Sequence, residues 1–141
     1  MTGAVAATRM QRRSRRTEGR TRILAAARAV VERGDSLTTL ALSDELGVSQ
    51  GYYARYFPSI EKIAAAVADD LLTDVLAEID QAVAAVVAAG GDTRAQLDAA
   101  WHSFAQLVTE RPGVALLLLS RPTHAEQLIA VVGEYVASQD E

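Results

Sequence analysis

Residues 38–57, TTLALSDELGVSQGYYARYF, decide the fold that we expect for this chain. The first half predicts a short helix, because Thr38 is a suitable N-cap and Leu42 and Leu46 recur at a spacing that turns both inward. Gly47 follows, and glycine adopts the positive φ angle of a tight turn at little cost. The stretch therefore begins as a helix that stops abruptly at a glycine.

A second short helix is expected directly after this turn, over residues 50–56, with Ser49 as its N-cap. Tyr53 and Phe57 would face inward, and Pro58 would end the helix because proline cannot continue one. The remaining side chains would form an outer face toward a groove of DNA: Gln50, Gly51, Tyr52 and Arg55. Two short helices that cross at a glycine turn, with one face left free, predict a helix-turn-helix unit.

Upstream, a first helix is expected to support this unit. Thr17 is a suitable N-cap, hydrophobic residues follow at helical spacing, and Gly34 ends the helix. Residues 1–16 are small, polar and rich in arginine, so we expect a disordered arm there. The arm carries Arg9 and the candidate DNA contacts Arg12, Arg13, Arg15 and Arg16. Such an arm either contacts phosphates or the minor groove, or serves only as a solubilising tail.

Downstream, the sequence predicts a helical body. Residues 59–89 contain neither proline nor glycine and predict one long amphipathic helix. Breaks are expected at residues 90–91 and 112–113, with a fifth helix between them. A short apolar segment at residues 114–119 and a last helix at residues 124–137 complete the body.

The composition also favours an all-α fold. The 141 residues are 50% hydrophobic, alanine dominates, and aromatic residues make up only 5%. Alanine is the best helix former and a poor strand residue. The chain has no cysteine, which excludes disulfides and cysteine-based zinc sites and fits a cytoplasmic protein. No secretory signal is expected, because residues 1–16 contain no apolar h-region, and no apolar run approaches the roughly 20 residues that a membrane helix needs.

The net charge of −4 conceals an uneven distribution. Residues 1–57 hold ten basic and five acidic residues, a balance of +5, whereas residues 58–141 hold four basic and thirteen acidic ones, a balance of −9. Thirteen of the fourteen basic residues are arginine, whose planar guanidinium can contact phosphate or guanine through two hydrogen bonds. This asymmetry predicts that the first segment faces nucleic acid and that the second does not.

The quoted stretch and its flanks resemble the tetracycline-repressor (TetR) family of bacterial transcription regulators. The matching segments are RILAAARAVVERG at 22–34, LGVSQG at 46–51 and ARYFPSIEKI at 54–63. The resemblance covers residues 17–65, and the rest is similar to the family only as an acidic, alanine-rich helical body. It implies a three-helix helix-turn-helix head at residues 17–63 and a helical effector-binding and dimerisation body at residues 64–141.

The resemblance implies roles for individual residues of the head. Thr38 and Ser49 occupy positions where hydroxyl and backbone amide groups meet phosphates, and Tyr56 matches a position near the DNA backbone. The face that would contact bases carries Gln50, Tyr52 and Arg55. Gly51 costs a helix about 1 kcal/mol relative to alanine. Its presence would either allow a close approach to DNA or leave the second helix loose until it binds.

Two residues depart from the family pattern. Many members have Tyr where this chain has Ala54, and Lys where it has Ile60. Both are usual phosphate contacts in the family. Their absence shifts the expected contacts toward the outer face of the second helix and toward the arginine arm.

The resemblance also implies an inducer pocket in the body, for a small apolar effector and without a cofactor. The candidate lining residues are Trp101, His102, Phe104, Leu117, His124 and Tyr135, although a stripe of this kind is more often plain core than a ligand site. Members of the family form homodimers, usually through two further helices after the point where this sequence stops. The expected interface is then residues 114–119 or the last helix, unless the sequence is truncated.

Other classes of function find less support in the sequence. Residues 47–51, GVSQG, also match the G-x-S-x-G motif of α/β hydrolases, which needs a strand before the serine and a central sheet. Neither is predicted, and no other catalytic constellation occurs, so we do not expect an enzyme. The two histidines are not spaced as a metal-binding pair, and no metal site is expected. A helical protein-interaction module without DNA binding remains the alternative.

We therefore expect an all-α, cytoplasmic transcription regulator, most simply a repressor that a small-molecule effector releases from DNA. Its partner would be a near-palindromic double-stranded operator, bound by a homodimer.

Overall fold

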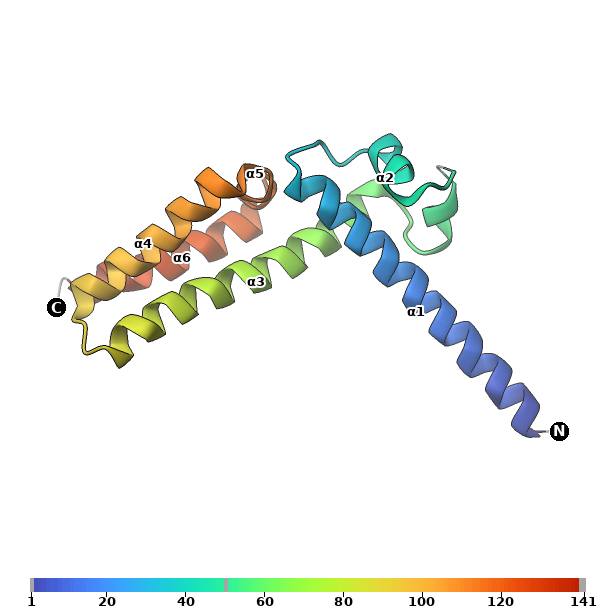
Figure 1. Cartoon of the computed structure of the whole chain (residues 1–141), viewed down its shortest axis with the longest axis horizontal. Coiled ribbons are helices and arrows are strands. Elements are labelled where there is room, and N and C mark those ends of the chain that lie inside the picture. The colour runs from blue at the N-terminus through green and yellow to red at the C-terminus, as the bar shows by residue number, and fades with distance from the viewer. Residues whose placement is uncertain (1, 50, 140–141) are drawn as a thin grey trace. The chain divides into compact units, whose positions relative to one another are not determined.

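The computed structural model describes residues 2–49 and 51–139, without the side chains of residues 2–9, 14, 132 and 135–139. Within these ranges all regular structure is helical and no strand occurs, so the all-α class is confirmed. The elements are α1 (Thr2–Glu32), α2 (Thr39–Leu46), the 3₁₀ helix η1 (Tyr52–Arg55), α3 (Ile60–Ala88), α4 (Thr93–Glu110), α5 (Pro112–Leu119) and α6 (Pro122–Gln139) (Figure 1). None of the helices in the described part of the chain is long and apolar enough to cross a membrane.

The chain divides into two compact units, residues 1–67 and 68–141. The boundary expected from the sequence, between the helix-turn-helix head and the helical body, was after residue 63. In the first unit, each element contributes apolar side chains to the buried interior: Ile23, Ala27, Val30, Leu42, Tyr53, Phe57 and Ile63. In the second, they come from α3 to α6: Leu71, Val75, Ile79, Val83, Ala100, Leu107, Val114, Leu118 and Leu128.

Helix α1 includes the arm, which is therefore helical and not disordered. Thr17 is not an N-cap, since its Oγ1 donates to the carbonyl oxygen of Arg13 inside the helix at 2.9 Å. Residues 4–16 contain no glycine or proline and are rich in alanine and arginine, which extend a helix well. Because the packed part of α1 is already helical, this extension needs no new nucleus. Figure 1 shows the N-terminal half of α1 standing clear of α2.

Two glycines end α1 and α2, as predicted. Gly34 and Gly47 have φ angles of 84° and 69°, in the left-handed region that glycine tolerates best. After α1, the N–H of Gly34 donates to the carbonyl of Val31 and the N–H of Asp35 donates to that of Val30. This pair of bonds is a Schellman motif, which satisfies two carbonyl groups at the end of the helix.

Arg33 ties the end of α1 to α2. Its Nε lies 3.1 Å from Oδ2 of Asp35, and its Nη1 lies 2.5 Å from Oε2 of Glu45. Glu45 first and Asp35 second raise the pKa of Arg33 above its ordinary value, so the guanidinium stays charged. These structural contacts occupy Arg33, and we do not count it among the candidate DNA contacts.

Helix α2 is capped as predicted. Thr38 has an extended backbone, and its Oγ1 accepts from the N–H of Ala41 at 3.0 Å. Leu42 is fully buried, but Leu46 is only partly buried. Leu42 is therefore the residue through which α2 reaches the interior of the first unit.

The second short helix is the four-residue turn η1, and the α-helix predicted over residues 50–56 is wrong. Gly51 is the N-cap residue and offers no side chain, so Ser49 does not cap it. Instead, the carbonyl of Ser49 accepts from the N–H of Tyr52 at 3.1 Å. Glycine and tyrosine are weak helix formers, and Pro58 leaves no room for another turn.

Helix α3 is the long helix that the sequence predicts. The Oγ of Ser59 caps it by accepting from the N–H of Lys62 at 3.2 Å. It ends at Ala88, and Gly90 follows in the turn with a φ angle of 83°. Asp92 then caps α4, because its Oδ1 accepts from the N–H of Ala95 at 2.9 Å.

Two prolines begin helices in the second unit. Pro112 was expected to break the chain, but it occupies the first turn of α5 directly after α4. Pro122 begins α6, two residues before the expected start at residue 124. The first residues of a helix have no intrahelical partner for their N–H groups, so proline loses nothing there.

Candidate nucleic-acid interface

Two aromatic residues anchor η1 on the first unit. Tyr53 and Phe57 are 6% and 4% exposed, and both were predicted to face inward. The Oη of Tyr53 donates to the carbonyl oxygen of Thr39 at 3.2 Å, which ties η1 to the first residue of α2. Buried phenols need such a partner, because an unpaired buried hydroxyl is costly. The two anchors fix which side of η1 faces outward.

The outward side carries most of the predicted contacts. Exposed residues among them are Thr38, Ser49, Gly51 and Arg55. Tyr52 is partly buried, and Gln50 lies outside the described residues. Gly51 has φ −81° and ψ −9°, which any residue can adopt, and a Cβ placed on it would meet nothing within 4 Å. The fold of the free protein therefore does not require glycine at this position.

Tyr56 is partly buried and pairs with Tyr52. Their ring centroids lie 5.6 Å apart, with the planes tilted by 50°. The hydrogen bond between the two phenols, followed by burial, raises the pKa of Tyr56, while Arg55 and Arg22 act in the opposite direction. Tyr56 therefore remains a neutral hydrogen-bonding group in the field of two arginines.

Helix α1 lies directly against η1 at a single glycine. A Cβ on Gly19 would overlap the Cζ, Cε1 and Oη atoms of Tyr56, so the phenol ring rests on the backbone of α1. One residue further on, the guanidinium carbon of Arg20 lies 4.4 Å from the centre of the Phe57 ring. Neither contact was predicted from the sequence. An isolated glycine inside a helical pattern was the available signal.

The four arginines predicted to contact DNA all lie exposed on α1: Arg12, Arg13, Arg15 and Arg16. Arg12, Arg16 and Arg20 are four residues apart and so follow one side of the helix. We call these three residues the arginine row. Because Arg20 lies over Phe57, the row runs along the side of α1 that meets η1.

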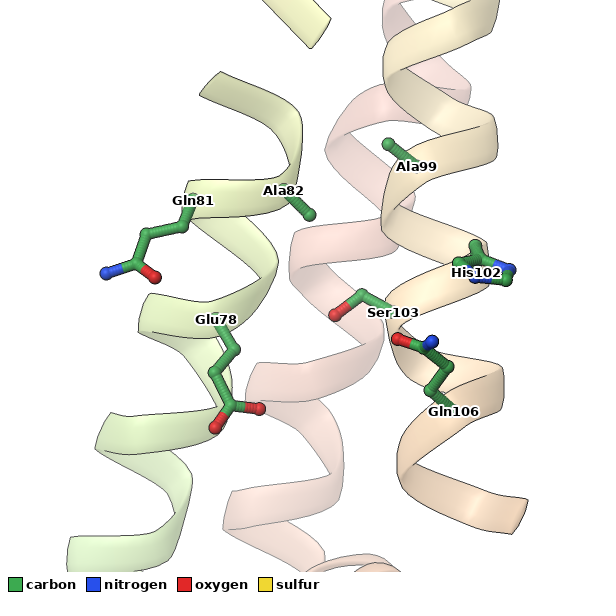
Figure 2. A pocket seen from close by; sticks show the side chains of 7 residues that line it. All are labelled: Glu78, Gln81, Ala82, Ala99, His102, Ser103 and Gln106. Carbon is green, nitrogen blue, oxygen red and sulfur yellow. The ribbon is translucent and has the colours of Figure 1, made fainter. Parts of the chain in front are cut away.

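In the second unit, a groove of about 460 Å³ lies between α3 and α4 (Figure 2). Its lining residues are Glu78, Gln81, Ala82, Ala99, His102, Ser103 and Gln106. Figure 2 shows Ala82 and Ser103 pointing into the space between the two helices. Glu78 also lies 3.6 Å from Nη1 of Arg111. Most of the lining can form hydrogen bonds, so the groove suits a polar ligand.

Six residues were predicted to line an inducer pocket, and among the five whose side chains the structure describes, His102 alone lines this groove. Trp101 is 48% exposed and meets the edge of Phe104, with ring centroids 6.2 Å apart. Adjacent residues of an α-helix point about 100° apart, so Trp101 and His102 face different sides of α4. The sequence pattern grouped residues that the helix separates.

Leu117 and His124, two further predicted pocket residues, lie elsewhere. His124 is buried on α6, with its Nε2 2.7 Å from Oδ1 of Asp69 on α3. It therefore links two helices and does not line the groove. Leu117 is partly buried on α5, and the side chain of Tyr135 lies outside the described residues.

In the described part of the chain, no group of three or more His, Asp or Glu side chains is placed to bind a metal ion.

Comparisons with protein-family models, curated proteins and solved structures found no match to this chain.

Proposed function

We propose that this chain is a DNA-binding transcription regulator whose first unit works as a helix-turn-helix head of the TetR type. The construction of η1 is the observation that carries the proposal. Tyr53 and Phe57 bury the inner side of the turn and leave Gly51 and Arg55 exposed on the outer side. In such a head, α2 would cross the DNA backbone and η1 would enter the major groove.

The charge of the first unit supports the same function. Affinity for DNA comes largely from neutralised phosphates, and the arginine row adds three exposed guanidinium groups along α1, of which that of Arg20 lies over Phe57, two residues after η1. Arg55 is the exposed basic residue of η1 itself. Arginine can donate two hydrogen bonds to the major-groove edge of guanine, so Arg55 is the proposed base contact.

Gly51 offers a direct test of how closely η1 approaches DNA. We expect Gly51→Ala to leave the fold unchanged, because the backbone angles suit alanine and no atom lies near the added methyl group. Affinity for the operator should fall about tenfold, since the methyl group would occupy the space that a base edge needs. Fluorescence anisotropy with the operator measures the affinity, and circular dichroism checks the fold.

The matched control for this test is Gly133→Ala, which adds the same methyl group at an exposed helical position of α6 with open space around it. Its affinity should equal that of the unchanged protein. A higher affinity for Gly51→Ala would contradict close approach and would show that glycine only keeps η1 loose before binding.

The proposal includes a homodimer and an effector. Large apolar side chains lie exposed on α4, α5 and α6, and a second copy would cover them: Trp101, Val108, Leu116, Leu119 and Ile129. Two copies would place two η1 turns on a near-palindromic operator. The groove between α3 and α4 is the proposed effector site, and its polar lining supports a polar effector in place of the small apolar one that the resemblance implied.

Binding-site selection from random double-stranded DNA tests the whole proposal. We expect enrichment of a near-palindromic motif, with half-sites about one helical turn apart or a multiple of it. Enrichment of a single half-site would remove the dimer and keep the DNA contact. No enrichment at all would overturn the proposal and favour an interaction module, for which the exposed Leu40 on α2 would be the first surface to examine.

A further inference from the structure

Gly19 stands in the middle of α1 and is buried, although the residues on either side of it are exposed. Glycine inside a helix is unfavourable, and nothing in the backbone of a regular helix calls for it. The one feature that does call for it is the ring of Tyr56, whose Cζ, Cε1 and Oη atoms fill the place of a Cβ. The glycine is therefore a seat for that ring.

The contact between Gly19 and Tyr56 lies between the arginine row and η1. Gly19 precedes Arg20, the last member of the arginine row, and Arg20 lies over Phe57, two residues after the end of η1. On the other side, Tyr56 pairs with Tyr52 at a ring separation of 5.6 Å, so it also holds the first residue of η1. Any side chain at position 19 would push Tyr56 away from α1.

We propose that Gly19 is a positioning residue, which seats Tyr56 on α1 so that the arginine row and η1 contact DNA as one continuous surface. This inference rests on the proposed DNA-binding function. It assigns the alignment of the row with η1 to the contact between Gly19 and Tyr56. Without that contact, the arginine row would no longer lie along phosphates while η1 contacts the bases.

A double-mutant cycle on DNA binding tests the proposal. Gly19→Ala should bind the selected operator about tenfold more weakly, a loss equivalent to one or two phosphate contacts. In a chain that carries Tyr56→Ala, the ring is absent, so adding Gly19→Ala should cause no further loss. Losses that simply add would show that Gly19 does not act through Tyr56 and would overturn the proposal.

Thermal unfolding separates positioning from stability. Alanine extends a helix better than glycine, so Gly133→Ala should raise the unfolding temperature by a few degrees. Gly19→Ala gains the same helix propensity but displaces the end of the Tyr56 ring, and the two effects oppose each other. We therefore expect its unfolding temperature to stay close to that of the unchanged protein. A large drop in unfolding temperature with unchanged affinity for DNA would make Gly19 a packing residue only.

A distance measurement without DNA keeps this inference separate from the proposed function. The chain has no cysteine, so Gln11→Cys on α1 and Ala54→Cys on η1, both exposed, give one clean pair of spin-label sites. Gly19→Ala should shift or broaden the distance distribution between the labels. If the selection finds no DNA motif, the proposed function fails, and an unchanged distance distribution overturns the positioning role independently.

Discussion

Replacing Arg12, Arg13, Arg15 and Arg16 together by glutamine is expected to weaken operator binding about 100-fold at physiological salt. All four side chains are exposed on α1, and glutamine supports a helix nearly as well as arginine, so the fold should be retained. Each phosphate that an arginine neutralises adds about 0.9 to the slope of log K against log salt concentration. The slope should therefore become shallower, by up to about 3.6 if every one of the four contacts a phosphate.

The matched control replaces the same four residues by lysine. Lysine keeps the charge and differs mainly in losing the planar, two-bonded contact. If the contacts are to phosphates, the lysine variant should keep the salt slope and lose only a little affinity. If the glutamine variant shows an unchanged slope in anisotropy titrations, α1 makes no phosphate contacts and its arginines only increase solubility.

Leu42→Ala is the substitution with the largest expected effect on stability. Leu42 is fully buried at the centre of α2, so the change removes buried methyl groups and leaves a cavity. Such substitutions cost about 2–5 kcal/mol of the free energy of unfolding, a large part of the roughly 5–15 kcal/mol of a typical domain. We expect the first unit to lose most of its stability, and DNA binding with it.

Leu40→Ala provides the control on the same helix. Leu40 is 59% exposed, so the same change of side chain at this position should alter the free energy of unfolding by less than about 0.5 kcal/mol. Urea unfolding followed by circular dichroism measures both variants. Equal losses at the two positions would show that helix propensity, and not burial of Leu42, governs the stability of α2.

The local features of the fold were predictable because each depends on a few neighbouring residues. Thr38 needs only the backbone N–H of Ala41 to act as a cap, and Gly34 and Gly47 end helices because they alone tolerate a positive φ angle there. The inward placement of Tyr53 and Phe57 follows from their spacing and their hydrophobicity. None of these predictions required knowledge of distant contacts.

The errors concern properties that local pattern does not determine. Residues 1–16 looked disordered by composition, yet residues 2–16 extend a helix that the packed half of α1 has already nucleated. Residues 50–56 had a plausible cap but too few strong helix formers to complete an α-helical turn before Pro58. The contact of Gly19 with Tyr56 joins positions 37 residues apart, so no local pattern contains it.

The residues predicted to line an inducer pocket are spread over the second unit for a different reason. Its residues were grouped by chemical type, but the face of α4 that meets α3 is set by how the two helices pack. That packing selects His102, Ser103 and Gln106 and turns Trp101 to another side. A polar groove took the place of an apolar pocket because small and polar side chains, not aromatic ones, occupy the facing positions.

The N-terminal half of α1 has a consequence for how order and binding depend on each other. Arg12, Arg16 and Arg20 repel one another at four-residue spacing along α1. An anion bound along this side relieves that repulsion, so binding and helix formation are thermodynamically linked. A polyanion that binds here makes this segment more helical. By reciprocity, the segment binds the polyanion more tightly when it is already helical, and the two effects have the same factor. A bound polyanion would therefore stabilise the helix on which the arginine row stands.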